Sequence, residues 1–193
     1  MNIGVIFAGG VGSRMHSKDR PKQFLDIYNK PIIVHTIEHF QNSEDIDSIV
    51  VVCIEGWIDY MNQLVYQYRL NKVKKIVPGG KTGQLSIYNG LIAAQEIARD
   101  EENIVLIHDG VRPLINEELI KRNIQDVKDY GSSITSGIVK ETIVEIYDNN
   151  DIKLVPDRAH SRVAKAPQCF WLKDILSAHK KAMNEQSFNF IDS

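Results

Sequence analysis

The chain has 193 residues, of which 23 are basic and 25 acidic, and its formal net charge at pH 7 is -2. That length is typical of one globular domain, and the near balance of charge leaves no general basic field for a nucleic-acid backbone. No apolar run approaches the roughly 18 residues that suggest a membrane span, and the N-terminus lacks the basic start of a secretory signal, so we expect a cytoplasmic protein without membrane association.

Short apolar runs alternate with longer amphipathic stretches over the first two thirds of the chain. The runs expected as strands are Ile3–Ala8, Ile49–Cys53, Lys75–Val77 and Ile104–His108. The stretches expected as helices are Pro31–Phe40, Trp57–Tyr68, Ser86–Ala98 and Glu117–Tyr130. This alternation predicts βαβ units and therefore an α/β fold with a three-layer, mostly parallel sheet. Ligands of such sheets bind beyond the carboxyl ends of the strands.

The pattern changes after Gly131. Further strands are expected at Ser132–Val139, Thr142–Ile146 and Ile152–Val155, and they predict a β-arm that protrudes at about residues 139–160. Ala164–Phe170 is expected to return to the sheet, and Leu172–Met183 to form a last amphipathic helix. The chain ends at Ser193 without a cap or a polar tail, so we expect a truncated C-terminus of a single domain over residues 1–193. The two cysteines, Cys53 and Cys169, lie among apolar neighbours and are expected to be buried.

A glycine-rich loop, AGGVGSRM, follows the first expected strand. Its glycines, Gly9, Gly10 and Gly12, let the backbone turn its N–H groups inward and form an anion site. The cations Arg14, Lys18, Arg20 and Lys22 come next, and such a cluster suits a polyphosphate. The loop lacks the Lys-Ser/Thr pair of an ordinary P-loop, and a solvated basic loop remains the alternative.

Two more loops follow expected strands. In VPGGKTGQLS, Gly80 and Ser86 are candidates to hold a base or ribose, although Ser86 could simply lie in the first turn of a helix. In HDGVRP, Asp109 stands where a magnesium ligand is expected, because Mg²⁺ is typically held by one or two carboxylates plus substrate phosphates. Arg112 is either a phosphate contact or a structural pin of the turn. His108 is expected to be a partly exposed strand end and not a catalytic base.

Six motifs in this order resemble the cytidylyltransferases of the 2-C-methyl-D-erythritol 4-phosphate and ribitol 5-phosphate group: AGGVGSRM, PKQFL, IVPGGKTGQLSIYNGL, IHDGVRP, KETIVE and APQCF. The resemblance implies a Rossmann-like α/β fold whose β-arm forms a homodimer. It also implies a Mg²⁺-dependent reaction in which a polyol phosphate attacks the α-phosphate of CTP and releases pyrophosphate.

The resemblance further implies a role for individual residues. Arg14 and Lys22 would be catalytic, and Asp109 would bind the metal. The residues implied to bind the nucleotide are Ala8, Gly9, Gly10, Gly12, Gly80, Ser86, Asp109 and Gly110. The residues implied to bind the acceptor are Asp109, Arg112, Thr142 and Arg158. The last two lie on the arm, where they would serve either their own or the neighbouring subunit.

Several positions depart from the methylerythritol branch, namely Lys81, Gly83, Gly110 and Ala166. The segments GGVGSRM and HTIEHF resemble the ribitol-phosphate branch more closely and, with Gly110 and Ala166, favour D-ribitol 5-phosphate as acceptor and CDP-ribitol, for teichoic acid or capsule, as product. The alternatives are a 2-C-methyl-D-erythritol 4-phosphate cytidylyltransferase of isoprenoid synthesis and a nucleotide-binding module without turnover. A NAD-binding domain is disfavoured, because no acidic residue closes a second strand about 20 residues after the glycines.

Overall fold

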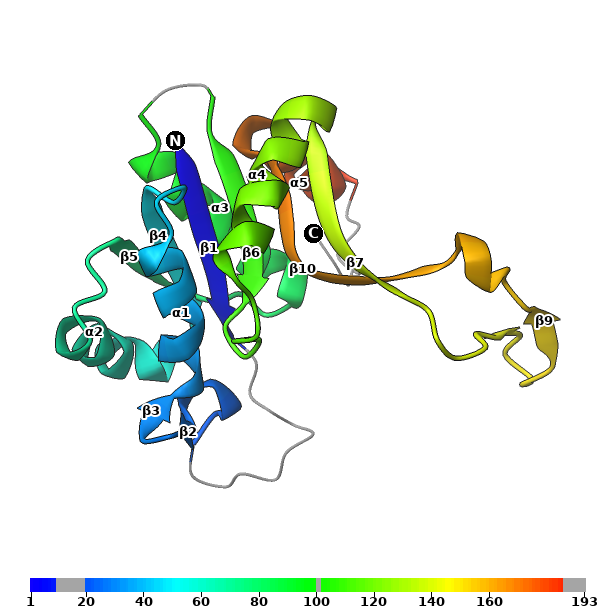
Figure 1. Ribbon diagram of the computed structural model, residues 1–193, viewed down its shortest axis with the longest axis horizontal. Coiled ribbons are helices and arrows are strands. Elements are labelled where there is room, and N and C mark those ends of the chain that lie inside the picture. The colour runs from blue at the N-terminus through cyan, green and yellow to red at the C-terminus, as the bar shows by residue number, and fades with distance from the viewer. Residues whose placement is uncertain (10–19, 100–101, 186–193) are drawn as a thin grey trace.

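The computed structural model describes residues 1–9, 20–99 and 102–185, and its centre is a six-stranded sheet in the order β5-β4-β1-β6-β10-β7 (Figure 1). β1 pairs in parallel with β4 and β6, and β4 with β5, whereas β10 is antiparallel to both β6 and β7. The strands are β1 Asn2–Ala8, β4 Ser48–Cys53, β5 Val73–Pro78, β6 Ile104–Asp109, β7 Ser132–Ile138 and β10 Arg162–Trp171. The expected α/β fold with a mostly parallel sheet is confirmed.

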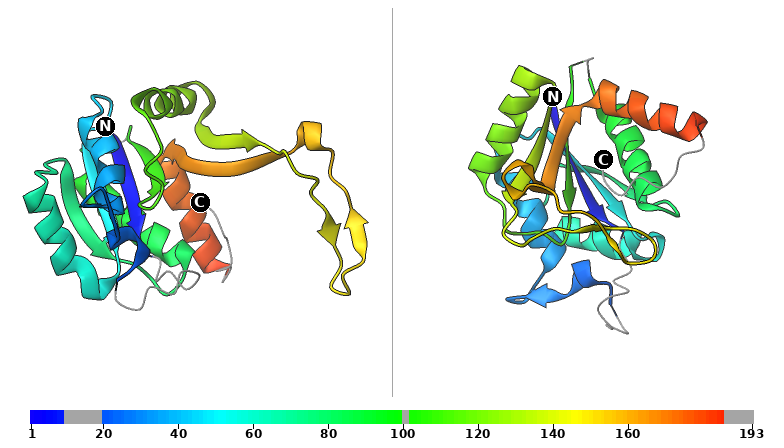
Figure 2. Two further views of the ribbon diagram at one scale, coloured as in Figure 1. Left: turned by 60° about the horizontal axis from the view of Figure 1, so that its bottom comes forward. Right: turned by 90° about the vertical axis from the view of Figure 1, so that its right-hand side faces the viewer.

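Helices cover both faces of this sheet (Figure 2). One core cluster joins the sheet to α1, α2 and α4 through residues such as Ile37, Met61 and Ile124, and the other joins it to α3 and α5 through Leu91 and Leu176. The helices are α1 Ile32–Asn42, α2 Ile58–Gln67, α3 Gly83–Ile97, α4 Glu117–Tyr130 and α5 Leu172–Asn184. Within the described residues, none of them is both long and apolar enough to cross a membrane.

Capping residues explain where two of these helices begin and end. The Asn116 side chain accepts a hydrogen bond from the Leu119 amide, and Gly131 ends α4 with a φ of 90°, a conformation that glycine adopts without strain. α4 therefore has the bounds that its sequence predicts. α3 begins three residues before Ser86, because the hydroxyl of Thr82 caps it by accepting a hydrogen bond from the Leu85 amide.

Some expectations about local structure are wrong. The strand expected at Thr142–Ile146 is limited to β8, Glu145–Ile146, which pairs with β9, Ile152–Leu154. A small hairpin of β2, Asp26–Ile27, and β3, Lys30–Pro31, was not expected. Its two-residue turn holds Tyr28 and Asn29 at positive φ, which the residue types alone do not suggest.

The β-arm is confirmed. Residues 139–161 leave the sheet after β7 and return in β10, and the two limbs extend well away from the helices (Figures 1 and 2). Large apolar side chains are exposed along the arm and at its base: Ile138, Ile143, Val144, Ile146, Tyr147, Ile152, Leu154, Val155 and Val163. Exposed apolar side chains gathered on one hairpin are common at protein–protein interfaces.

Candidate active site

Four parallel strands end at one edge of the sheet. Phe7 of β1 pairs with Asp109 of β6, and Ala8 pairs with Cys53, the last residue of β4. The edge therefore brings together two of the predicted site segments, the start of the glycine loop at Ala8–Gly9 and the turn at Asp109–Gly110. The other predicted residues of the first loop, Gly10, Gly12 and Arg14, lie outside the described residues.

The loop after β5 lies against the same edge. The Gly79 amide donates to the carbonyl of Cys53, and a Cβ built on Gly9 would lie 3.9 Å from the Ser86 hydroxyl oxygen. That hydroxyl accepts a hydrogen bond from the Gly80 amide over 3.0 Å and donates to the carbonyl of Thr82 over 2.9 Å. Ser86 thus lies in the first turn of α3 and also fixes the Gly80 loop to that turn.

Gly80 has no room for a side chain. A Cβ on this residue would lie 2.4 Å from the Leu85 Cβ and 2.9 Å from its carbonyl carbon. The glycine lets the loop fold back on the first turn of α3.

Lys22 is the first residue of a short 3₁₀ helix, η1 Lys22–Phe24, and the two residues that follow it, Gln23 and Phe24, are buried. The buried Gln23 side chain donates to the carbonyl of Ala8. Phe24 is fully buried and stacks on Trp57, with ring centroids 4.9 Å apart, and meets Tyr60 edge-on at 5.3 Å. The backbone of Lys22 is therefore held beside the end of β1.

These anchoring residues are not evident from the sequence. PKQFL marks the segment, but Trp57 and Tyr60 come from η2, Glu55–Trp57, and α2, more than 30 positions along the chain. Aromatic residues after a buried strand are a signal only of helix packing. Nothing in their spacing shows that they pack on Phe24, two residues after Lys22.

Asp109 is the last residue of β6, and its side chain is 44% exposed. The Arg112 Nε donates to its carboxylate, so Arg112 makes the structural contact that was one of its two predicted roles. The Gly110 amide donates to the carbonyl of Phe7 over 2.7 Å and extends the β1–β6 pairing by one residue. A Cβ on Gly110 would lie 2.7 Å from that same oxygen, so the turn lies closer to β1 than a side chain would allow.

The donor set at this edge suits a hard cation that takes most of its ligands from phosphate. Asp109 offers one carboxylate, and in the described part of the chain no group of three or more His, Cys, Asp or Glu residues gathers to form a metal cage. Mg²⁺ is commonly held in this way, by one or two carboxylates together with substrate phosphates. The residues present therefore fit the expected ion.

Burial controls the ionisation of two neighbours of the edge. It lowers the pKa of His108, which is buried and not partly exposed as expected, and whose Nε2–H donates to the carbonyl of Arg112. Burial also raises the pKa of Cys53 to about 11. Cys169 is equally buried, and the burial of both cysteines is confirmed. The imidazole is thus neutral and the Cys53 thiol protonated at neutral pH.

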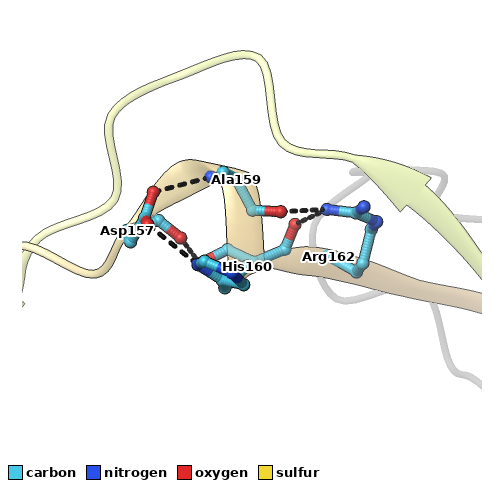
Figure 3. A network of polar contacts seen from close by, with 5 residues as sticks. Asp157, Ala159, His160 and Arg162 are labelled. Atoms are coloured by element: carbon cyan, nitrogen blue, oxygen red, sulfur yellow. Dashed lines mark hydrogen bonds and ion pairs between the residues drawn. The ribbon is translucent and has the colours of Figure 1, made fainter.

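On the arm, Arg158 begins the 3₁₀ turn η3, Arg158–His160, and its guanidinium donates to the carbonyl of Lys140 on the other limb. Asp157 caps this turn: its carboxylate accepts from the Ala159 amide at 2.9 Å and contacts His160 Nδ1 at 2.8 Å (Figure 3). These two hydrogen bonds lower the pKa of Asp157, and the bond from the Ala159 amide has the larger effect. Arg162 closes the turn by donating to the carbonyls of Ala159 and Ser161.

The structure does not bring all predicted site residues together. Thr142 and Arg158 belong to the arm, and the arm extends away from the sheet that carries Ala8 and Asp109 (Figures 1 and 2). Within one chain the site therefore has two separated parts, the strand edge and the arm.

Comparisons with known proteins agree with this geometry. A sequence model of the family described as 2-C-methyl-D-erythritol 4-phosphate cytidylyltransferase matches residues 3–193. A ribitol-5-phosphate cytidylyltransferase of Streptococcus agalactiae serotype V is 58% identical over all 193 residues, which cover 80% of that protein. A 2-C-methyl-D-erythritol 4-phosphate cytidylyltransferase of Clostridium botulinum is 41% identical over 181 residues, which are 93% of this chain and 76% of the relative.

A solved structure shares the fold. The 4-diphosphocytidyl-2C-methyl-D-erythritol synthase of Anaerococcus prevotii superimposes with a TM-score of 0.83 at 25% identity, over 99% of this chain and 80% of the other. The resemblance seen in the sequence motifs is confirmed.

Proposed function

The chain belongs to the 2-C-methyl-D-erythritol 4-phosphate cytidylyltransferase family, and we propose that it transfers the cytidylyl group of CTP to D-ribitol 5-phosphate, giving CDP-ribitol and pyrophosphate. Membership makes it a CTP-dependent nucleotidyltransferase. One observation carries the choice of acceptor: the relative named for ribitol 5-phosphate is 58% identical over the whole chain, against 41% for the one named for methylerythritol phosphate. The methylerythritol phosphate enzymes are the more distant branch.

In the proposed reaction, an oxygen of the acceptor phosphate attacks the α-phosphorus of CTP, and the bond to the leaving pyrophosphate breaks. The attacking phosphate is already an anion, so the step needs no strong general base. Its difficulty is the approach of two polyanions. Such a reaction is accelerated mainly by positioning and by cations placed where charge develops.

The strand edge supplies those elements. The backbone at Ala8–Gly9 and Gly80 would receive the nucleotide together with Gly10 and Gly12, and Ser86 would hold the Gly80 loop in shape through its hydrogen bond from the Gly80 amide. Lys22 would stabilise charge at the α-phosphate, together with Arg14. The fixed backbone beside Lys22 supports this role, because a preorganised cation needs little rearrangement during the reaction.

Asp109 would hold Mg²⁺, and the bound ion would neutralise charge on the triphosphate. Gly110 would lie beside the nucleotide at the same turn. Arg112 would keep the Asp109 carboxylate oriented and present a further cation toward the acceptor. Its ion pair with Asp109 and the exposure of both side chains support this arrangement.

The proposed assembly is a homodimer formed through the arm. A two-stranded hairpin is marginally stable alone in water, and this one carries exposed apolar side chains along its length. Thr142 and Arg158 would then bind the acceptor phosphate at the strand edge of the neighbouring subunit. The arm that carries them extends away from the sheet of its own chain (Figures 1 and 2), which supports this placement.

The cellular setting is part of the same proposal. CDP-ribitol is an activated polyol phosphate, suited to the synthesis of teichoic acid or capsular polysaccharide. The synthesis is proposed to take place in the cytoplasm, where CTP is available.

The decisive experiment compares two acceptors. Pyrophosphate release is measured with CTP and Mg²⁺ at saturation, and kcat/KM is determined for D-ribitol 5-phosphate and for 2-C-methyl-D-erythritol 4-phosphate. A higher value for ribitol 5-phosphate supports the proposal, and a higher value for the other acceptor overturns it. CTP binding without turnover of either acceptor would identify a nucleotide-binding module instead.

A further inference from the structure

The turn that follows β6 is held by two buried side chains with no direct role in the proposed reaction. Two of its amides donate hydrogen bonds to nearby backbone: the Gly110 amide donates to the carbonyl of Phe7, and the Arg112 amide donates to the carbonyl of Asp109. The carbonyls of Gly110 and Arg112 each accept a hydrogen bond from a side chain. The donors are the Thr36 hydroxyl of α1, at 2.9 Å, and the His108 imidazole of β6, at 3.0 Å.

Thr36 occupies an unusual position for a hydroxyl. It is fully buried on a helix face otherwise made of Ile32, Ile33, Ile37 and Phe40. Its hydroxyl reaches across to Gly110, 74 positions along the chain, at a shorter distance than the 3.4 Å to the carbonyl of Ile32 one turn earlier in its own helix. A buried hydroxyl is costly unless it is bonded, so this residue type is explained by the turn and not by packing.

His108 makes the same kind of contact from the other side. It is 1% exposed, its ring packs near Phe40 at 5.5 Å, and its Nδ1 has no hydrogen-bond partner. A carbonyl can only accept, so the single proton of the neutral ring is at Nε2 and points to Arg112. Nδ1 of His108 is therefore left without a hydrogen-bond partner, while Nε2–H binds the Arg112 carbonyl of the turn.

We propose that Thr36 and His108 are positioning residues for Asp109. They donate hydrogen bonds to the carbonyls of Gly110 and Arg112, which without these donors would have to turn toward water to find a partner. The turn is then attached to β1, α1 and β6 at once, and the Asp109 carboxylate and its partner Arg112 can shift little relative to the strand edge. This inference rests on the proposed function, in which that carboxylate binds Mg²⁺. Partners that orient a metal ligand typically change metal affinity or activity by about 10- to 100-fold when they are removed.

The test compares Thr36→Val, which keeps the shape and removes the donor, with Thr36→Ser, which keeps the donor. We expect Thr36→Val to raise the Mg²⁺ concentration for half-maximal activity by about tenfold or more and to lower kcat, and Thr36→Ser to stay near the parent protein. Urea unfolding of each variant shows that the assays use folded protein. A purely structural role would change the unfolding midpoint but leave the Mg²⁺ titration where it was.

A second readout does not need turnover. Amide hydrogen exchange in the 104–116 segment should be faster in Thr36→Val than in the parent protein and unchanged in Thr36→Ser. If Thr36→Val does not fold, His108→Leu and His108→Gln form the corresponding pair, since glutamine retains an N–H donor.

The outcomes separate the two proposals. Equal exchange and an equal Mg²⁺ titration in Thr36→Val and the parent protein overturn the inference. A parent protein without turnover of either acceptor overturns the proposed function, and the exchange comparison then still decides whether Thr36 holds the turn.

Discussion

The side-chain amide of Gln23 donates a hydrogen bond to the backbone carbonyl of Ala8, 15 residues earlier in the chain. Ala8 is the last residue of β1, and Gln23 directly follows Lys22. The contact is buried, so it is protected from competition with water. It ties the position of Lys22 to the end of the strand on which the glycine loop begins.

Gln23→Met removes this donor while keeping a similar length. We expect kcat to fall about tenfold with a smaller change in the KM for CTP, because the proposed role of Lys22 is to stabilise the transition state. The stability should fall by about 1–3 kcal/mol, since the Ala8 carbonyl loses its buried partner. Steady-state kinetics and urea unfolding measure the two effects, and a Gln23→Met protein with the parent kcat would contradict the first.

Lys22→Ala should lower kcat by about 10²–10³, the usual loss when one preorganised electrostatic donor is removed. The matched control is Lys30→Ala, which removes a lysine paired with Glu38 outside the strand edge. The control should retain nearly the parent rate. Similar losses in both variants would show that general charge, and not the position of Lys22, matters.

Asp109→Asn keeps the shape of the side chain and removes the charge. We expect the Mg²⁺ titration of activity to shift at least tenfold toward higher concentration, because a hard cation prefers a carboxylate to an amide oxygen. Asp59→Asn, on α2, serves as the control. An unchanged titration curve in Asp109→Asn would assign this residue another role.

The stability of the fold should decrease as the pH falls below about 6.5. Burial lowers the pKa of both His108 and His179 from the ordinary value of 6.5, so the folded protein takes up these protons at a lower pH than the unfolded chain. The stability that comes from keeping the two histidines neutral is fully present above pH 6.5. As the pH drops toward their pKa values in the folded protein, the free energy of unfolding falls by up to about 1.4 kcal/mol per pH unit for each histidine. Urea unfolding at pH 7.5 and 5.5 should show the loss, and His179→Gln should reduce it. Equal stability at the two pH values would refute this.

Ile152→Glu should dissociate the proposed dimer. Ile152 is 66% exposed on β9, and a charge there opposes burial against a partner. Leu114→Glu is the control, because Leu114 is 96% exposed but lies outside the arm. Light scattering at micromolar concentration should give a dimer for the parent protein and the control and a monomer for Ile152→Glu. A monomeric parent protein would count against the proposal.

The strongest sequence signals came from features that are complete within one segment. The apolar run Ile49–Cys53 and the capped helix between Asn116 and Gly131 carry their structure in their own residues, and both were predicted nearly to their ends. The strand predicted from Thr142 begins only at Glu145, because β-branched residues favour pairing but, among the residues that the structure describes, Thr142 lies beside no pairing strand. The place of Asp109 at the end of a strand could be predicted, because a strand end is recognisable from the sequence.

The residues that support the site, Thr36 and Gln23, could not be identified from local sequence patterns. Thr36 reads as one more residue on the inner face of a helix, and Gln23 as part of a polar turn. Their partners are the backbone carbonyls of Gly110 and Ala8, which every residue possesses and which leave no trace in the sequence. Only the tertiary arrangement shows which carbonyl each side chain reaches.

The order of the sheet also bears on how the protein forms during synthesis. Within the described residues, β7 pairs with β10 alone, and β10 separates it from β6. The four parallel strands β1, β4, β5 and β6, by contrast, have all been synthesised once Asp109 has been added. In a growing chain, β1, β4, β5 and β6 can therefore pair before β10, residues 162–171, has been made, whereas β7 cannot join the sheet until then. The base of the arm closes where Ile138 pairs with Arg162, so the segment that carries Thr142 and Arg158 can be fixed to the sheet only after the pairing of β1, β4 and β6 has become possible.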